Sequence, residues 1–239
     1  MNARIVAIVQ ARMGSKRLPG KSMADLAGKP LLWQFLERIK RCNSVNEIVL
    51  ATTAKSQDNV LIQVANRCKV QTFRGAENDL IDRYYQAAKL FQADIVVRIC
   101  ADNPVVEPAE VDRIINYHQS NDSDFSSNTH NIKGNMYPDG LGAEVFDFTI
   151  LKELRQLTDN PEHKEHLHSY FYEHPEKYKI GTISCPKSFQ RPYLKLDVNT
   201  PEELKFMQAI YKYWYEKNNN FHIKDIIWWY DNIWKKKVS

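Results

Sequence analysis

A cluster of cationic side chains lies near the start of the chain, in the segment AIVQARMGSKRLPGKSM of residues 7–23. It consists of Arg12, Lys16, Arg17 and Lys21, interspersed with Gly14, Ser15 and Gly20. Glycines let a backbone approach a ligand closely, and neighbouring Lys and Arg side chains match the oxygens of a polyphosphate. The segment therefore predicts a polyphosphate-binding loop, with a solvated basic turn as the alternative. Its glycine spacing differs from that of the GxxxxGK[ST] phosphate loop.

Two carboxylates later in the chain are predicted to face the same ligand. Asp102 follows the buried run DIVVRIC of residues 94–100, and Asp197 lies near the end of the run YLKLDV of residues 193–198. Burying a carboxylate is costly unless a cation is paired with it, and Mg²⁺ prefers oxygen ligands that it shares with phosphates. Together with the cationic loop, the two carboxylates predict a metal–nucleotide site. A helix cap is the alternative for either one alone.

These residues need a scaffold, and the first 120 residues alternate between two hydrophobic patterns. Continuous apolar runs predict buried strands at 4–9, 47–52, 70–73 and 94–100. Apolar residues at helical spacing predict helices at 30–41, 57–68, 80–91 and 108–120. This alternation is typical of an α/β protein with a mostly parallel sheet and helices on both faces. Because ligands bind such sheets at the carboxyl ends of the strands, the basic loop and Asp102 are expected at that edge.

The pattern is looser from about residue 121, where a polar, turn-rich segment begins. Strands are predicted at 143–146, 178–184 and 193–198. A helix is predicted over 160–175, with Asn160 as its cap and Pro161 in its first turn. Thr200 and Glu203 predict a capping box at the start of a helix over 200–218.

Composition excludes some classes of function. A net charge of +4 and a pI near 8.7 are too mild to indicate nucleic acid as the main partner. No apolar stretch reaches the length of about 18 residues that a membrane span needs, so we expect no membrane insertion. The four cysteines are widely spaced without a CxxC pair, which favours reduced thiols over a zinc site or a disulfide framework. We therefore expect a cytoplasmic protein.

Several segments carry a resemblance to a known family. VQARMGSKRLPGKSM, FRGAENDLIDRYYQAAK, RICADNPVVEP, YPDGLGAEVF and LDVNTPEEL, spread over about residues 4–210, resemble the cytidylyltransferase-like family typified by the spore-coat polysaccharide protein SpsF. The chain is more distantly similar to the CMP-KDO synthetases and acylneuraminate cytidylyltransferases. The resemblance implies a nucleotide-diphospho-sugar transferase fold, which is GT-A-like and Rossmann-like. It also implies a homodimeric enzyme that uses Mg²⁺ to transfer CMP from CTP to a sugar and releases pyrophosphate. For this chain we expect an acidic, nonulosonic-type acceptor used in surface polysaccharide or glycoconjugate synthesis, with an amino sugar acid or a smaller polyol phosphate as the alternatives.

The resemblance also implies roles for particular residues. Nucleotide contacts are expected from Ala11, Arg12, Gly14, Ser15, Arg17, Lys21, Ala51, Thr52, Asp79 and Arg83, and sugar contacts from Asp139, Glu144 and His166. Mg²⁺ is expected at Asp102, Asp197 and Asn199, and catalysis is assigned to Arg12, Lys21, Asp102 and Asp197. Asn199 departs from the family, which usually has Asp immediately before the TPED motif. Asp197 is expected to replace that ligand, since residues two apart on a strand point the same way.

Alternatives remain for the function and for two segments. One alternative is a GT-A-type glycosyltransferase that uses a ready-made nucleotide sugar, although such an enzyme would not need the RLPGK loop. The other is a non-catalytic nucleotide-binding protein, which would explain why Asn199 replaces the acid of the family. The clustered histidines 163, 166 and 168 are expected on a solvated helix face, with a substrate contact by His166 or a zinc site as the alternatives. We expect one domain over 1–217, divided into a nucleotide half (1–120) and a sugar-binding or dimerisation half (121–217). The amphipathic helix within 218–239 would pack on the domain, contact a partner, or lie on a membrane surface.

Overall fold

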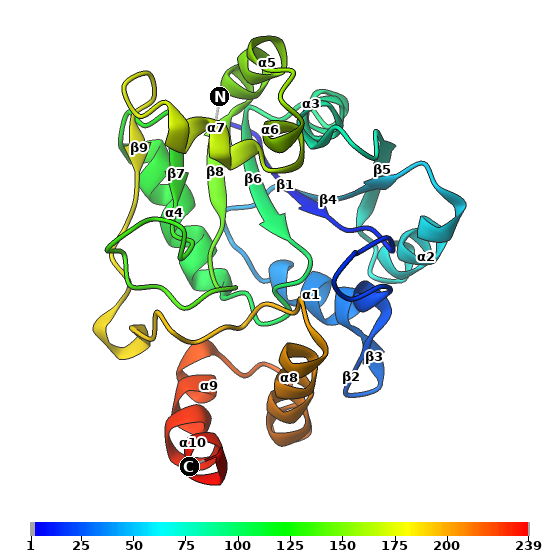
Figure 1. Cartoon of the computed structure of the whole chain (residues 1–239), viewed down its shortest axis with the longest axis vertical. Helices are drawn as coiled ribbons and strands as arrows, with labels where there is room; N and C mark the ends of the chain where they lie inside the picture. The colour runs from blue at the N-terminus through cyan, green and yellow to red at the C-terminus, as the bar shows by residue number, and fades with distance from the viewer. Residues whose placement is uncertain (1–2, 239) are drawn as a thin grey trace.

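The computed structural model describes residues 3–238 and is built on a central mixed sheet (Figure 1). Among those residues, seven strands join in the order β5-β4-β1-β6-β8-β7-β9. They are β1 Ile5–Gln10, β4 Glu47–Thr53, β5 Gln71–Gly75, β6 Ile95–Cys100, β7 Phe125–Ser127, β8 Glu144–Asp147 and β9 Ile180–Gly181. β8 is antiparallel to both of its neighbours, and the other pairings are parallel. The prediction of an α/β fold with a mostly parallel sheet is confirmed.

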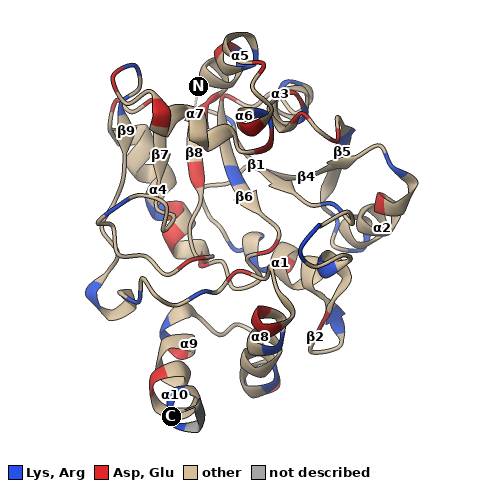
Figure 2. Cartoon of the chain, in the orientation of Figure 1, with Lys and Arg blue, Asp and Glu red and all other residues tan. Residues whose placement is uncertain are grey.

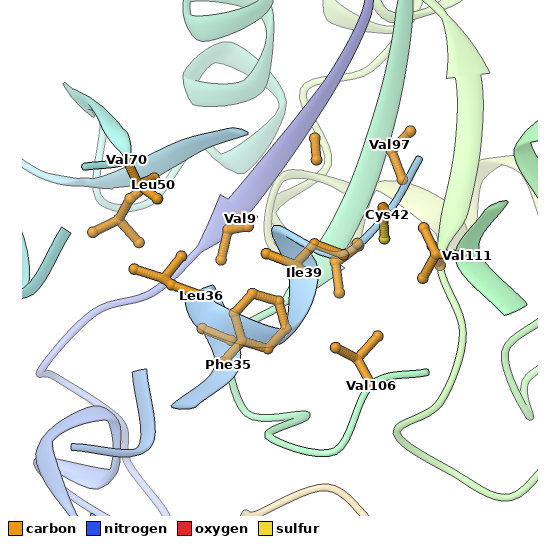
Figure 3. Close-up of a cluster of buried hydrophobic side chains, with 14 of the residues drawn as sticks. Val9, Phe35, Leu36, Ile39, Cys42, Leu50, Val70, Val97, Val106 and Val111 are labelled. Atoms are coloured by element: carbon orange, nitrogen blue, oxygen red, sulfur yellow. The ribbon is translucent and has the colours of Figure 1, made fainter. Parts of the chain in front are cut away.

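Helices cover both faces of the sheet, because its strands bury side chains on each side. One core combines β1, β4 and β6 side chains, among them Val9, Leu50 and Val97, with α1 Leu31–Ile39, α2 Asn59–Arg67 and α4 Pro108–Ser120 (Figure 3). The opposite core combines residues such as Val6 and Ile8 with α3 Leu80–Leu90, α5 Phe148–Leu157 and α7 Leu167–Glu173. The sequence predicts four of these helices to within a few residues. It does not predict α5, whose two fully buried leucines are a weak apolar signal.

The basic loop returns to the core through two small elements that the sequence does not predict. Lys21–Met23 form a short 3₁₀ turn, and β2 Asp25–Leu26 pairs with β3 Lys29–Pro30 as an antiparallel hairpin. Gly20, with a φ of 74°, precedes the turn in the left-handed conformation that favours glycine. This turn places Lys21 near the carboxyl end of β6, where its ammonium group bonds to Asp102.

The predicted strand over 193–198 is wrong, because this segment never joins the sheet. It is tied instead to two loops: Asp139 N donates to Leu194 O at 3.0 Å, and Val198 N donates to Asp102 O at 2.8 Å. Gly140 makes the approach possible, since a Cβ there would lie 2.7 Å from the carbonyl carbon of Leu196. The segment therefore crosses the carboxyl ends of the strands and brings Asp197 to them.

The predicted helix over 160–175 is divided in two. Asn160 caps α6 Pro161–Glu165 as predicted, by accepting a hydrogen bond from Glu162 N at 3.0 Å. The helix ends at His166, whose φ of −130° and ψ of 72° are not helical, and α7 begins at the next residue. The predicted strand over 178–184 is also shorter than expected, since only β9 pairs.

The C-terminal segment forms a third core. α8 Pro201–Trp214 begins with the predicted capping box of Thr200 and Glu203. It shares buried apolar side chains with α9 Ile223–Trp229, which is followed by a π-helical turn, Tyr230–Trp234, and by α10 Lys235–Val238. Figure 1 shows both helices on the side of the molecule away from α3 and α5. Among the described residues, no helix is long and apolar enough to cross a bilayer.

Candidate active site

A large polar cavity opens at the carboxyl ends of β1 and β6. Its volume is about 960 Å³. Its walls come from the loop after β1, the turn after β6, the loop between β7 and β8, the corner between α6 and α7, and residues 197–199. The predicted residues that line it are Ala11, Arg12, Ser15, Arg17, Lys21, Arg83, Asp102, Asp139, Glu144, His166, Asp197 and Asn199. The fold therefore gathers in one cavity residues that are up to 188 positions apart, from 11 to 199.

The basic loop and the carboxylate edge meet at Lys21. Its Nζ lies 2.6 Å from Asp102 Oδ2, 2.8 Å from Asn199 Oδ1 and 3.0 Å from the carbonyl oxygen of Val198. Arg17 Nη2 donates to the same Asn199 Oδ1 at 2.7 Å. Asn199 also donates a hydrogen bond from Nδ2 to Asp197 Oδ2. A neutral amide fits here because one side chain accepts from two cations and donates to a carboxylate, which an aspartate could not do.

The other end of the loop faces the corner between α6 and α7. Arg12 Nη2 lies 2.5 Å from Glu165 Oε1, an ion pair that the sequence analysis did not identify. Arg83 is buried nearby and donates from Nη1 to the carbonyl oxygen of Ala76 at 2.8 Å. Its Nε is buried without a hydrogen-bond partner among the described residues. This end of the cavity thus holds two guanidinium groups that are suited to an anionic ligand.

Asp58, a residue that we did not predict, anchors the basic loop. Its buried carboxylate accepts hydrogen bonds from Met13 N at 2.8 Å, from Thr53 N at 3.2 Å, and from the hydroxyls of Thr52 and Thr53. Burial alone would raise the pKa of Asp58, but the hydrogen bonds from Thr53, Met13 and Thr52 outweigh it, and the pKa is lowered. An aspartate a few residues after a strand is too common to reveal such an anchor in the sequence.

We expect Asp58→Asn to destabilise the fold by about 2–3 kcal/mol at pH 7, because one amide hydrogen must then face a backbone N–H donor. The folded-state pKa of Asp58 lies below the unfolded value of about 3.9. The stabilisation is therefore present above that value and is lost as the pH falls through the folded-state pKa. Urea unfolding at pH 7 and pH 3 should show a smaller difference between variant and wild type at pH 3. Asp122→Asn, at a fully exposed carboxylate, is the matched control, and an equal effect there would contradict the assignment.

Asp197 is the carboxylate best suited to face a cation. Burial first, and then the negative charges of Asp139 and Asp102, raise the pKa of Asp197 to about 6. Its Oδ1 is buried and accepts no hydrogen bond from the described residues. A divalent cation would satisfy this oxygen. Within residues 3–238, no three His, Cys, Asp or Glu side chains form a metal site by themselves, so such a cation would need oxygens from a ligand as well.

The far wall of the cavity carries paired side chains from several elements. Arg98 on β6 and Glu144 on β8 form an ion pair of 2.5 Å, and both are buried. Figure 2 shows a basic stretch of β6 beside an acidic stretch of β8. His130 Nδ1 lies 2.7 Å from Asp139 Oδ1, and this hydrogen bond raises the pKa of His130. His166 and His168 also line this wall, because the helix break turns both toward the cavity.

Four of the predicted nucleotide-binding residues lie outside the cavity lining. Ala51 is buried in the core formed with α3, and Thr52 is fully buried with its hydroxyl bonded to Asp58. Asp79 caps α3 by accepting from Asp82 N at 2.8 Å. Gly14 belongs to the basic loop but packs beside Gln57. The nucleotide contacts of these four residues stay predictions. In the structure, Ala51, Thr52 and Asp79 make local structural contacts.

Comparison with known proteins agrees with this geometry. A family model described as cytidylyltransferase matches residues 6–231. The spore coat polysaccharide biosynthesis protein SpsF of Bacillus subtilis is 28% identical over 213 residues, which cover 87% of this chain and 86% of that protein.

Solved structures show the same relationship. A cytidylyltransferase from Leptospira borgpetersenii has a TM-score of 0.89 at 28% identity, covering 96% of this chain and 94% of that one. CMP:2-keto-3-deoxy-manno-octonic acid synthetase complexed with CTP has a TM-score of 0.66 at 19% identity, covering 88% of this chain and 99% of that one, and so shares the fold. With its basic loop and carboxylates gathered at one sheet edge and with a family match over residues 6–231, this chain belongs to the cytidylyltransferase family of nucleotidyltransferases.

Proposed function

We propose that this protein transfers CMP from CTP to the hydroxyl group of a sugar and releases pyrophosphate. The observation that carries the proposal is the contact of Lys21 with Asp102 and Asn199. Through it, a cationic loop suited to a triphosphate meets carboxylates suited to a metal in one cavity. The related synthetase whose structure holds CTP supports the choice of nucleotide.

The basic loop would act on the triphosphate. Arg12, Arg17 and Lys21 would bind the phosphate oxygens and stabilise the charge that develops on the departing pyrophosphate. In the structure all three are paired with Glu165, Asn199 or Asp102. On binding, the phosphates of CTP would replace these partners, so the three cations would lose little further contact with water.

Asp102 and Asp197 would hold Mg²⁺ together with the phosphates of CTP. The unpartnered buried Oδ1 of Asp197 fits this role. When bound, the ion would neutralise negative charge on the phosphates and orient them for in-line attack. Asn199 would keep Asp197 oriented through its Nδ2 hydrogen bond, so we propose it as a positioning residue next to a site with two carboxylates.

The acceptor side is the wall that carries Asp139, Glu144 and His166. We propose a sugar acid as the acceptor class, because the CTP-bound relative is named for an octonic acid and SpsF for a coat polysaccharide. His130 supports this choice, since the hydrogen bond to Asp139 raises the pKa of His130 and so favours its cationic form. A cytoplasmic homodimer and the division into two halves at residue 120 stay predictions.

CTP with Mg²⁺ should stabilise the folded protein, because ligand binding to the native state lowers its free energy. At 100 times the dissociation constant the gain is about 2.7 kcal/mol, which for a chain of this size raises the Tm by about 5–10 °C. Thermal unfolding with CTP, UTP, ATP and GTP, with and without Mg²⁺, measures this effect. Lys21→Met should abolish most of the shift, whereas Lys29→Met, on the exposed hairpin outside the cavity, should preserve it. Stabilisation by nucleotide sugars alone would instead indicate a glycosyltransferase.

A further inference from the structure

His168, near the start of α7, lies on the acceptor side of the cavity and has no role in the function described so far. Its side chain is 19% exposed and lines the cavity. The non-helical conformation of His166 separates α7 from α6. Because of this break, His168 faces the sheet rather than solvent, contrary to the expectation of a solvated helix face. The ring lies against Tyr172 of the next helical turn, with 5.8 Å between ring centroids.

A buried arginine fixes the tautomer of His168. Nδ1 lies 3.4 Å from Arg98 Nη1, and a guanidinium group can only donate hydrogen bonds. Nδ1 must therefore accept, so the neutral ring carries its single proton on Nε2. Glu144 Oε1 lies 3.6 Å from Nδ1, which is outside hydrogen-bond distance. Glu144 instead holds Arg98 in place, because its Oε2 accepts from Nη1 at 2.5 Å.

The proton on Nε2 makes His168 a hydrogen-bond donor toward the cavity. Within residues 3–238, no side chain or backbone group hydrogen-bonds to this nitrogen. Since the side chain is partly exposed and lines the cavity, the N–H group is available to a ligand. The ligand atom that binds there must accept a hydrogen bond, and a carboxylate oxygen forms the strongest bond of this kind.

His166 places a second imidazole ring beside the first. Its ring centroid lies 5.8 Å from that of His168, and both residues line the cavity. No hydrogen bond or ion pair joins the His166 ring to any residue in the described part of the chain. Two neighbouring rings that can each donate one N–H group suit the two oxygens of a single carboxylate.

The charges around these rings favour an anionic ligand. Burial is the main cause that lowers the pKa of His168, and Glu144 opposes it. Arg98 on β6, His166 at the helix corner and His130 on the β7–β8 loop lower the pKa further. Positive charges that disfavour an imidazolium ion at this position stabilise a negative group beside the ring. Glu144, the opposing charge, is itself neutralised by Arg98.

We propose that His168 and His166 bind the carboxylate group of the acceptor sugar, each donating one N–H group to it. The inference rests on the proposed function and deepens it, because it assigns the acid group of the acceptor to the corner between α6 and α7. Arg98 is a positioning residue, since it acts on the ligand only through the tautomer of His168.

Histidine NMR tests the donor without an acceptor. Long-range ¹H–¹⁵N spectra of the ¹⁵N-histidine-labelled full chain, with His168→Gln to assign the signal, report the protonation state and the tautomer. We expect a neutral ring at pH 7 with its proton on Nε2. A ring that is charged at pH 7, or that carries its single proton on Nδ1, would overturn the proposal. Either result concerns His168 alone, whereas failure of CTP to stabilise the wild type would count against the proposed function.

Kinetics then test the contact with the acceptor. Pyrophosphate release is measured from CTP with 3-deoxy-manno-octulosonate or N-acetylneuraminate, using whichever the wild type accepts. We expect His168→Phe, which keeps a ring but removes the donor, to raise the acceptor KM by about 10–100-fold. The KM for CTP and the CTP-induced Tm shift should stay unchanged. His168→Gln, whose amide can donate, should recover most of the affinity, and His174→Phe, at the other end of α7 and outside the cavity, should match the wild type.

The methyl ester of the same sugar acid distinguishes a carboxylate contact from a loss of packing. In the wild type, the ester should have an acceptor KM that is higher by a similar factor. In His168→Phe, the difference between acid and ester should shrink to a few-fold, because the two changes remove the same contact. Equal acceptor KM values for the wild type and His168→Phe, or an undiminished preference of the variant for the acid, would refute the proposal. A wild type that uses neither acid would overturn it together with the acceptor class, even if CTP stabilises the protein.

Discussion

Asp102→Asn should abolish nucleotidyl transfer while leaving the fold intact. The substitution keeps the size of the side chain, and the backbone hydrogen bond from Val198 N to the carbonyl oxygen of residue 102 does not depend on the side chain. What it removes is the negative charge that now pairs with Lys21 at 2.6 Å and that we propose to hold Mg²⁺ on the phosphates. A fall in kcat of about 10³-fold, or about 4 kcal/mol of barrier, is expected from that loss.

Pyrophosphate release and thermal unfolding, measured on the same preparation, separate the two effects. The Tm of Asp102→Asn should stay within a few degrees of wild type, and its Mg²⁺-dependent stabilisation by CTP should disappear. Asp25→Asn provides the matched control, because this carboxylate is exposed on β2 away from the cavity. If Asp102→Asn kept more than about a tenth of the wild-type rate, equivalent to roughly 1.4 kcal/mol, Asp102 would not be an essential ligand.

The meeting of the basic loop with Asp102 could be predicted because both are placed by local rules. Lys21 and Asp102 follow strands with continuous apolar patterns, and the carboxyl ends of parallel strands meet at one edge. Neither placement needs information about distant parts of the chain. Asp197 reached the same edge for a different reason: the predicted strand does not exist, and Gly140 and the backbone of Asp102 hold the segment in place.

The contacts on the far wall of the cavity could not be predicted, although the resemblance implied Asp139, Glu144 and His166, because these contacts join distant segments. An unbroken helix over 160–175 would direct His166 and His168 differently, and the break at His166 appears in no local pattern. Arg98 is a single charge within an apolar strand, and its partner lies 46 residues away. Nothing in the sequence pairs them until β8 is known to lie beside β6.

The ion pair between Arg98 and Glu144 allows the most demanding test of stability. Their side chains are 6% and 2% exposed, so the removal of one charge leaves the other buried without a partner. Glu144→Gln or Arg98→Met should therefore each lower the free energy of unfolding by about 3–5 kcal/mol. For a chain of this size that corresponds to a fall in Tm of about 10 °C or more. Chemical unfolding at pH 7 measures the free energy of unfolding. If each single variant lay within about 1 kcal/mol of wild type, which is the contribution of an exposed ion pair, the prediction would be contradicted.

The double variant Arg98→Met/Glu144→Leu tests whether this ion pair serves the fold alone or also the reaction. A buried ion pair replaced by apolar side chains of similar volume is often no less stable, because two desolvated charges are removed together. We therefore expect the double variant to recover most of the stability that each single variant loses. If the pair served only the fold, the recovered protein would also recover its activity. Because Arg98 and Glu144 also line the cavity on the side that we propose for the acceptor, we expect instead a stable protein that binds CTP and transfers CMP slowly.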